Sequence, residues 1–268
     1  MNYHSIKVQQ QDRIARLTLA RSDKHNAFDA QMISELNQAL QHLAAQPELS
    51  LLVLRAEGKH FCAGADLDWM KRQAQMSEAE NLADANELAR MLDRLNTFPT
   101  PVLACVQGAA FGGALGLVAC ADIVLAQRNC RFCLSEVKLG LIPATISPYV
   151  GRAIGLRQLR RYALSAETID ADTAQRLGLV HQLCDDLSDA ERTMISQLQA
   201  NGPAALRAGK DLLLSIDPHT GDPAQQQDTA RRIAQIRVTA EAQEGLTAFF
   251  QQRPPAWRSP SHEQGEPS

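Results

Sequence analysis

Apolar positions near the N-terminus recur first with the period of a strand and then with the period of a helix. Apolar and polar residues alternate over 6–8 and again over 15–19, on both sides of a polar turn, which predicts a half-buried β-hairpin. Between residues 32 and 43 the apolar residues recur at helical spacing, and the apolar run 51–54 is typical of a buried strand. The chain is therefore predicted to open as strand, strand, helix and strand.

A second round of elements follows the first. A polar stretch over 77–95 predicts a helix, and the apolar run 102–106 predicts another buried strand. A glycine-rich turn, a short helix and a strand over 123–126 come next. Alternation of this kind favours an α/β core with parallel strands.

Segment 101–126 also has the length and apolar character of a membrane span. Its only strongly polar side chains are Gln107 and Asp122. It contains four glycines, however, and a β-branched start, which fit a buried strand, a tight turn, a buried helix and a second strand better than one membrane helix. We therefore predict that no part of the chain spans a membrane.

Beyond about residue 153 the pattern becomes almost wholly helical. Asp170 and Gly178 have the properties of start and stop signals for a helix over 171–177. A longer stretch, 225–250, carries a discontinuous apolar pattern, and the tail after it is too polar and proline-rich to pack well. The C-terminal third is predicted to be mostly helix.

Composition excludes several classes of protein. The chain has 268 residues, of which 45% are hydrophobic, enough for one large core, and its net charge of −3 offers no positive field for nucleic acid. Its six cysteines lie mostly in apolar segments, which favours buried thiols in a reducing compartment. Cys130 and Cys133 have no matching second pair, so we predict packing residues and no metal site. No secretion or organelle signal is evident, which predicts a cytoplasmic protein.

Three segments carry candidate chemistry. The small residues of FCAGADL, at 61–67, leave the backbone open to a ligand, and GAAFGGA, at 108–114, opens a helix so that the N–H of Gly113 becomes a free donor at its positive end. Two such donors would form an oxyanion hole for a thioester enolate, although each motif alone also fits tight packing. Glu136 ends an apolar run; burial would raise its pKa and suit it to proton transfer, whereas a solvated Glu would have no such role.

These segments, in this order, resemble the enoyl-CoA hydratase/isomerase (crotonase) superfamily over residues 5–258. The matching stretches are RSDKHNAF at 21–28, FCAGADL at 61–67, AAFGGALGLVACADI at 109–123, FCLSEVKLGLIP at 132–143, RLGLV at 176–180 and EGLTAFF at 244–250. Two segments, ADLDWM at 65–70 and SEVKLGLIPATISPYV at 135–150, are most similar to those of bacterial methylglutaconyl-CoA hydratases and γ-carboxylated terpenoyl-CoA hydratases.

The resemblance implies an α/β fold, with a crotonase-like β-β-α spiral core and a C-terminal helical trimerisation region. The core with its acyl-CoA site would span 1–198, the helical region 199–258 and a polar tail 259–268. The family assembles as a trimer or a dimer of trimers. The expected partners are therefore an acyl-CoA thioester and further copies of the chain, with no nucleic acid and no membrane.

The resemblance also implies the roles of individual residues. It places the two oxyanion amides on Ala65 and Gly113 and the catalytic acid/base on Glu136. Contacts with CoA would fall on Lys24, His25, Ala27, Ala63, Asp66, Leu67, Phe249 and Arg253, the last two reaching a neighbouring subunit's ligand. The substrate pocket would include Trp69, Met70, Gly116 and Tyr149, of which Trp69 and Met70 equally fit the core. No metal and no separate cofactor is expected, because CoA is part of the substrate.

The sequence departs from the family at three places. Gly116 stands where hydratases of the two-glutamate type carry a second Glu, which with the first holds and splits a water. Segment 144–149 replaces a glycine-rich loop, and Gln252 replaces a basic contact.

Three accounts of the missing Glu remain open. Glu136 alone would suffice for a Δ3,Δ2-enoyl-CoA isomerase. Alternatively, the distal carboxylate of a glutaconyl-CoA, or another side chain, helps to position water while Glu136 acts as acid and base. Third, a nearby residue such as Tyr149 or Asp68 replaces the lost carboxylate.

We favour the second account, a hydratase of a branched α,β-unsaturated acyl-CoA such as 3-methylglutaconyl-CoA or a longer γ-carboxylated terpenoyl-CoA. A substrate carboxylate needs a cation. The candidates beside the motifs, each of which also fits an exposed surface charge, are Lys71, Arg72, Lys138 and Arg152. The alternative from another class is a protein that binds acyl-CoA or RNA without catalysis, and the net charge disfavours RNA.

Overall fold

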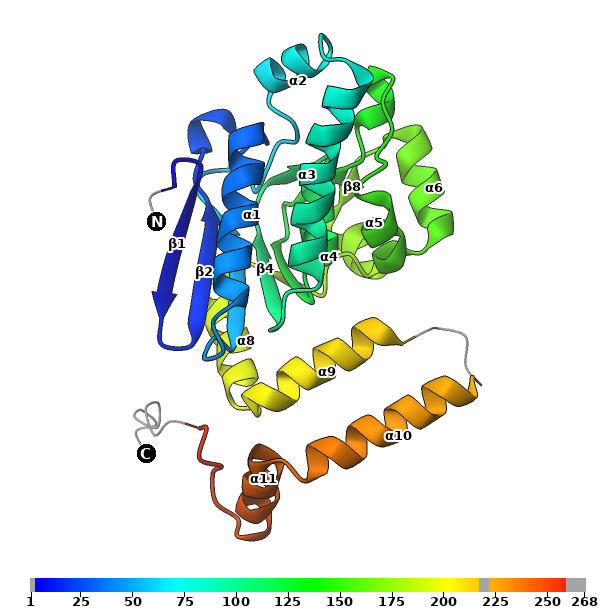
Figure 1. Cartoon of the computed structure of the whole chain (residues 1–268). Coiled ribbons are helices and arrows are strands. Elements are labelled where there is room, and N and C mark those ends of the chain that lie inside the picture. Colours follow the sequence, from blue (N-terminus) through cyan, green and yellow to red (C-terminus); the bar gives the residue numbers. More distant parts are fainter. Residues whose placement is uncertain (1–2, 217–221, 259–268) are drawn as a thin grey trace. The chain divides into compact units, whose positions relative to one another are not determined.

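The computed structural model describes residues 3–216 and 222–258 (Figure 1). The chain divides into two compact units, Met1–Glu191 and Arg192–Ser268, and each is considered by itself. The boundary lies within helix α8 (Leu187–Gln199), before the predicted boundary at residue 198. The predicted polar tail, 259–268, lies outside the described residues.

The predicted N-terminal hairpin is confirmed. Strands β1 (Ile6–Gln11) and β2 (Ile14–Leu19) pair in antiparallel fashion around a two-residue turn. Asp12 in this turn has a left-handed φ of 54°, a conformation that Asp tolerates better than most residues. Alternate side chains of β2, including Leu17 and Leu19, enter the core.

A parallel sheet continues from this hairpin. Its further strands are β3 (Leu51–Ala56), β4 (Val102–Val106), β6 (Ile123–Gln127) and β9 (Gln182–Cys184). The strand order is β1-β2-β3-β4-β6-β9, and β1 alone among them is antiparallel to its neighbour. Every residue of β4 is buried, which is the pattern of a parallel strand covered on both faces. The sheet confirms the predicted α/β core.

Two long helices, α1 (Ala30–Ala44) and α3 (Glu78–Asn96), pack against each other beside the sheet (Figure 1). Asp29 caps α1 by accepting a hydrogen bond from the N–H of Met32, and Ser77 and Glu80 form a capping box at α3. The short helix α2 (Leu67–Gln73) precedes α3. These caps explain why the helices begin where they do.

Segment 101–126 folds into the predicted sequence of strand, turn, helix and strand. After β4 come β5 (Ala109–Phe111), the buried helix α4 (Ala114–Cys120) and β6. A second sheet, in the order β5-β7-β8, contains β7 (Arg131–Cys133) and β8 (Ile169–Asp170). Among the residues that the structure describes, no helix is long and apolar enough to cross a membrane.

The region after residue 153 contains more strand than the sequence predicted. Its helices up to the boundary region are α5 (Ser147–Ile154), α6 (Leu156–Ser165) and α7 (Ala171–Leu177), and Asp170 and Gly178 flank α7 as expected. Strands β8 and β9, however, also lie there, and β9 extends the main sheet beside β6. Strands of two or three residues are too short to show a period in the sequence.

The second unit is helical, as predicted, but its long stretch is broken in two. It contains α9 (Pro203–Ser215), α10 (Pro223–Arg237) and α11 (Ala240–Phe250). The side chain of Thr239 accepts a hydrogen bond from the N–H of Ala242 and so caps α11. The break between α10 and α11 explains the discontinuous apolar pattern over 225–250.

All six cysteines are buried and free, which confirms their predicted packing role. Burial raises the pKa of the Cys62 and Cys130 thiols to about 12, so neither is a reactive thiolate near neutral pH. Within 3–216 and 222–258 no group of His, Cys, Asp and Glu side chains is arranged to hold a metal ion.

Candidate active site

The candidate site forms where the segment 61–66 runs along the segment 107–111. The N–H of Phe61 donates to the carbonyl of Gln107 (2.8 Å), and the N–H of Cys62 donates to the carbonyl of Ala109 (3.1 Å). The N–H of Phe111 returns a hydrogen bond to the carbonyl of Cys62 (3.0 Å). This pairing brings the first glycine motif against the second, although the two are far apart in the sequence.

A second loop, 21–28, closes over the same segment. Its short 3-10 helix η1 (Ser22–Lys24) is followed by His25 and Asn26, whose left-handed φ values of 51° and 55° reverse the chain. The N–H of Ala63 then donates to the carbonyl of His25 (3.0 Å), and Phe28 forms a parallel bridge with Ala65. These contacts bring together the predicted CoA-binding residues of both loops: Lys24, His25, Ala27, Ala63, Asp66 and Leu67.

Arg21 fastens these two loops, a role that the sequence analysis missed. Its guanidinium forms ion pairs with Asp29 (3.0 Å) and Asp66 (3.1 Å) and donates to the carbonyl of Ala27 (2.6 Å). Arg21 and Asp66 each lie within one of the matching sequence stretches, 21–28 and 61–67, but the spacing of 45 residues between them hid the pair.

The carboxylate of Asp66 has a structural role. It caps α2 by accepting hydrogen bonds from the N–H groups of Asp68 and Trp69, and only 7% of the residue is exposed. Burial alone would raise the pKa of Asp66, but these hydrogen bonds and the ion pair with Arg21 lower it overall. The predicted contact of Asp66 with CoA stays a prediction, and it would have to use the backbone.

The backbone amides of Ala65 and Gly113 have the properties of an oxyanion hole. Neither N–H donates a hydrogen bond to any residue that the structure describes. Gly113 is the N-cap of α4, where the helix dipole favours negative charge, and the Phe28 ring would lie 3.4 Å from a Cβ atom built on Gly113. Phe28 therefore links both amides, since it also bridges to Ala65.

Glu136 lies beside the second glycine turn, at Gly112. It opens the 3-10 helix η2 (Glu136–Leu139) after β7. A Cβ atom built on Gly112 would lie 3.5 Å from Oε1 of Glu136 and 3.9 Å from Cα of Gly64. Gly64 and Gly112 have positive φ values (107° and 54°), which L side chains rarely adopt, so a substitution at either position would strain the turn.

The environment of Glu136 suits proton transfer. Its Oε2 atom is buried and has no hydrogen-bond partner among the described residues. Burial raises the pKa of Glu136 above its ordinary value, and a hydrogen bond from its own backbone lowers it by less. A carboxylate with a raised pKa and a free oxygen is able to take up and release a proton near neutral pH.

The position of Gly116 is closed to a second carboxylate. A Cβ atom built there would lie 2.6 Å from Cγ2 of Ile146 and 3.0 Å from Cδ2 of Leu92. Both neighbours are almost fully buried, and the β-branched methyl group of Ile146 cannot easily turn away. Apolar side chains thus fill the space at this position.

The other predicted pocket residues lie in different settings. Trp69 is 6% exposed, and its indole N–H has no hydrogen-bond partner among the described residues, whereas Met70 is half-buried. Tyr149, in α5, packs partly buried against the hydrophobic core, and this burial raises its pKa. The pocket role of these three residues stays a prediction.

The two predicted CoA contacts in the second unit are both on the surface. Phe249 is 76% exposed, and its ring meets that of Phe250 edge-on. Arg253 holds Glu244 through two hydrogen bonds of 2.7 and 2.9 Å, and this pairing lowers the pKa of Glu244 to about 2. Their reach to a ligand also stays a prediction.

The crowding at position 116 gives a stability prediction. Gly116→Glu should lower the free energy of unfolding by more than about 3 kcal/mol, because it overfills the core and buries a charge. Gly209→Glu is the matched control, since Gly209 is also helical but has no atom within 4 Å of its Cβ position. Chemical denaturation measures both. Equal stability of Gly116→Glu and the wild type would show that the pocket has room for the second carboxylate.

Comparison with known proteins identifies the family. Residues 9–260 match the family model described as enoyl-CoA hydratase/isomerase. A 2,3-dehydroadipyl-CoA hydratase of Escherichia coli is 31% identical over 255 residues, which cover 94% of this chain and 97% of the relative. Two crystal structures superpose closely. An enoyl-CoA hydratase from Shewanella pealeana has 51% identity and a TM-score of 0.92, covering 95% of this chain and 96% of that one. AtuE of Pseudomonas aeruginosa has 35% identity and a TM-score of 0.90, covering 96% and 100%.

These relatives extend over nearly the whole chain, and the similarity includes the structure as well as the sequence. The fold is therefore the crotonase fold that the six sequence stretches implied. The protein belongs to the enoyl-CoA hydratase/isomerase family of enzymes.

Proposed function

We propose that this enzyme adds water reversibly to a branched α,β-unsaturated acyl-CoA, with 3-methylglutaconyl-CoA or a longer γ-carboxylated terpenoyl-CoA as its substrate. One juxtaposition carries the proposal. The unpaired amide of Gly113 follows Gly112, whose Cβ position lies 3.5 Å from Oε1 of Glu136 and 3.9 Å from Cα of Gly64, the residue before the unpaired amide of Ala65. An oxyanion hole beside one general acid/base is sufficient to form a thioester enolate and then to protonate it.

The reaction follows from these groups. Glu136 takes a proton from water as the water oxygen attacks Cβ, and the π electrons move onto the thioester oxygen. The two amides bind the resulting oxyanion, whose charge they stabilise without reorganisation. The enolate then collapses as Glu136 returns its proton to Cα. One proton and one hydroxyl group are added, and the carboxylate is regenerated.

Apolar surface beside both reacting segments suits an acyl-CoA. Leu67 follows the first amide and is 73% exposed, and Leu139, Leu141 and Ile142 follow Glu136 with exposures of 61%, 54% and 74%. Exposed aliphatic side chains grouped around a polar site are typical of a ligand-binding surface. In the proposed trimer or dimer of trimers, this surface, with Phe249 and Arg253, would contact the pantetheine and acyl groups.

The filled space at Gly116 supports a substrate that carries its own carboxylate. A hydratase with one glutamate lacks the second group that orients the attacking water. A distal carboxylate on the substrate would supply the missing acceptor, provided that a cation holds it in place. The E. coli relative is named for 2,3-dehydroadipyl-CoA, whose acyl group also ends in a carboxylate.

Lys138 is the one of the four cations that lies nearest to Glu136 along the chain. It lies in η2 with Glu136, it is exposed, and its side chain forms no ion pair with any described residue. Lys71, by comparison, pairs with Asp68 (3.4 Å). We therefore assign the substrate carboxylate to Lys138.

A second function, Δ3,Δ2-enoyl-CoA isomerase, is favoured by one observation. Moving a proton between two carbons needs one base, and Glu136 is the carboxylate that lies beside the Gly112 turn. In that reaction the same base would remove a proton from the carbon next to the thioester and return it two carbons further on.

Turnover of three substrates tests the proposal. With 3-methylglutaconyl-CoA, absorbance of the conjugated double bond should fall; crotonyl-CoA should react more slowly, and a 3-enoyl-CoA should gain no conjugation.

Glu136→Gln should lose about 10³-fold in kcat, while Glu48→Gln, an exposed control, keeps full activity. Lys138→Gln should raise KM about tenfold for the carboxylated substrate alone. Gain of conjugation from the 3-enoyl-CoA alone would establish the isomerase instead.

The raised pKa of Glu136 predicts a pH dependence. Because the base must be ionised, kcat/KM should fall with decreasing pH at an apparent pKa above the ordinary value of 4.5. The same raised pKa affects the free energy of unfolding. Glu136 favours folding while it is protonated, and this contribution is lost as pH rises through its folded pKa, which is the opposite of the behaviour of a carboxylate paired with a cation. Glu136→Gln should thus be at least as stable as the wild type at pH 7 by thermal unfolding. A variant that is both inactive and unfolded would contradict this role.

A further inference from the structure

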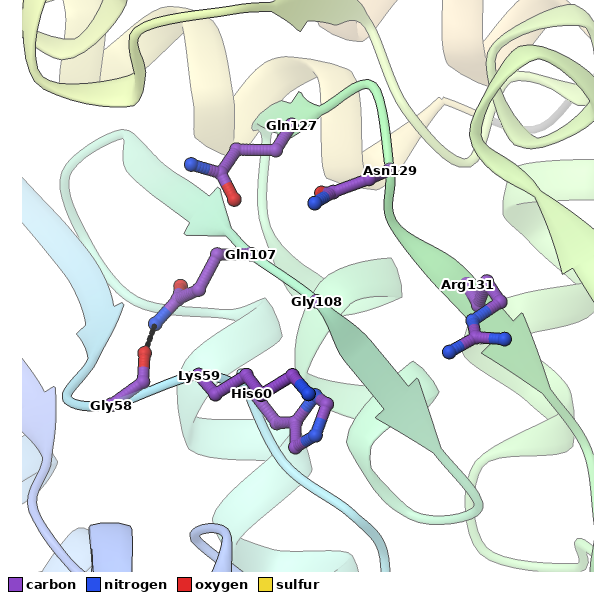
Figure 2. A pocket seen from close by; sticks show the side chains of 8 residues that line it. All are labelled: Gly58, Lys59, His60, Gln107, Gly108, Gln127, Asn129 and Arg131. Carbon is purple, nitrogen blue, oxygen red and sulfur yellow. Dashed lines mark hydrogen bonds between the residues drawn. The ribbon is translucent and has the colours of Figure 1, made fainter.

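A cavity of about 650 Å³ lies apart from Glu136, at the junction of the two sheets (Figure 2). Its lining residues come from the carboxyl ends of three neighbouring parallel strands and from the starts of two strands of the second sheet. They are Gly58, Lys59, His60, Gln107, Gly108, Gln127, Asn129 and Arg131. The carboxyl edge of a parallel sheet is a common place for ligands, and the volume is within the usual range for small-molecule sites.

The cavity and the candidate active site lie at opposite ends of β5 and β7. Gly108 and Arg131 are at the starts of these strands, whereas Gly112 and Glu136 follow their ends. Each strand has three residues, which corresponds to about 10 Å at the usual rise of a strand. The cavity is therefore separate from the proposed thioester site.

The lining is rich in donors and contains no carboxylate. The side chains of Lys59 and Arg131 are exposed, and neither forms an ion pair or hydrogen bond with any described residue. The side chains of Gln127 and Asn129 are likewise without a described partner. Two unpaired cations beside free amides form a site that attracts an anion.

His60 adds a donor of fixed orientation. Its Nδ1 accepts a hydrogen bond from the N–H of Ala109 (3.1 Å), so the proton of the neutral ring is on Nε2. Burial, followed by the positive charges of His25, Lys59 and Arg131, lowers the pKa of His60.

Gly108 shapes the middle of the cavity, where Figure 2 shows it between the Lys59–His60 pair and Arg131. A Cβ atom on Gly108 would lie 2.2 Å from the carbonyl oxygen of Lys59 and 2.7 Å from Nδ1 of His60, and its φ is +62°. Only glycine fits this position. Gln107 holds the other rim by donating to the carbonyls of Ala56 (2.7 Å) and Gly58 (3.2 Å).

We propose that this cavity is a second binding site, which takes a small phosphate-bearing ligand between Lys59, His60 and Arg131. The guanidinium of Arg131 has the planar fork that matches two phosphate oxygens, and Lys59 supplies a mobile point charge. A bare phosphate would leave most of the volume empty, so a phosphate ester with a small polar group fits it better. The amide side chains of Gln127 and Asn129 would bind that group.

Calorimetric titration with inorganic phosphate and with glycerol 3-phosphate, at constant ionic strength, tests this site directly. Both probes should bind the wild type, the ester more tightly. Lys59→Gln/Arg131→Gln should weaken both by more than about tenfold. Arg13→Gln/Arg128→Gln removes the same charge from exposed residues outside the cavity, and it should change the affinity by less than about twofold.

A second titration, in the presence of saturating CoA, separates this site from the proposed thioester site, because the rings of His60 and His25 meet edge-on at 5.2 Å. Unchanged phosphate affinity would support a separate site. Competition by CoA, equal losses in both double variants, or absence of binding to the wild type would overturn the proposal. A changed molar mass of Lys59→Gln/Arg131→Gln in light scattering, without any phosphate binding, would also overturn the proposal. It would mean that an acidic segment of another copy occupies the cavity.

Discussion

Close approach of backbone segments without side chains between them is the constraint on which the candidate site depends. Segment 61–66 lies between the loop 21–28 on one side and segment 107–111 on the other, and backbone hydrogen bonds join it to both. This arrangement presents the amides of Ala65 and Gly113 without partners and places Gly112 beside both Gly64 and Glu136. A Cβ on either of these glycines would add strain, because both have positive φ values.

Electrostatic preorganisation follows from the same arrangement. Arg21 forms ion pairs with Asp29 and Asp66, and these two carboxylates therefore help to hold the loops together. Glu136, by contrast, keeps a buried oxygen without a partner, and burial raises its pKa. The chain therefore separates carboxylates that support the structure from the one that is proposed to move protons. Apolar packing around Gly116 preserves this separation by leaving no space for another acid.

The sequence was informative wherever a pattern is local. Asp29, Ser77 and Asp170 cap helices at the positions that their side chains indicate, and the alternation over 6–19 predicts the observed hairpin. Long-range features were less accessible. The pair Arg21 and Asp66 joins distant segments, the two-residue strand β8 has no period to detect, and the clash of position 116 with Ile146 depends on a helix further along the chain. The glycine motifs revealed the site only because several of them occur together in a family order.

Formation of the enolate is the central claim, and exchange of the Cα protons tests it without requiring the natural reaction. We would incubate 3-methylglutaryl-CoA, the saturated counterpart of the proposed substrate, with the protein in D₂O and follow the Cα signals by NMR. The account predicts deuterium incorporation at the carbon next to the thioester with the wild type and none above background with Glu136→Gln. Absence of exchange in the wild type, or equal exchange in both proteins, would contradict the assignment of Glu136 and the two amides.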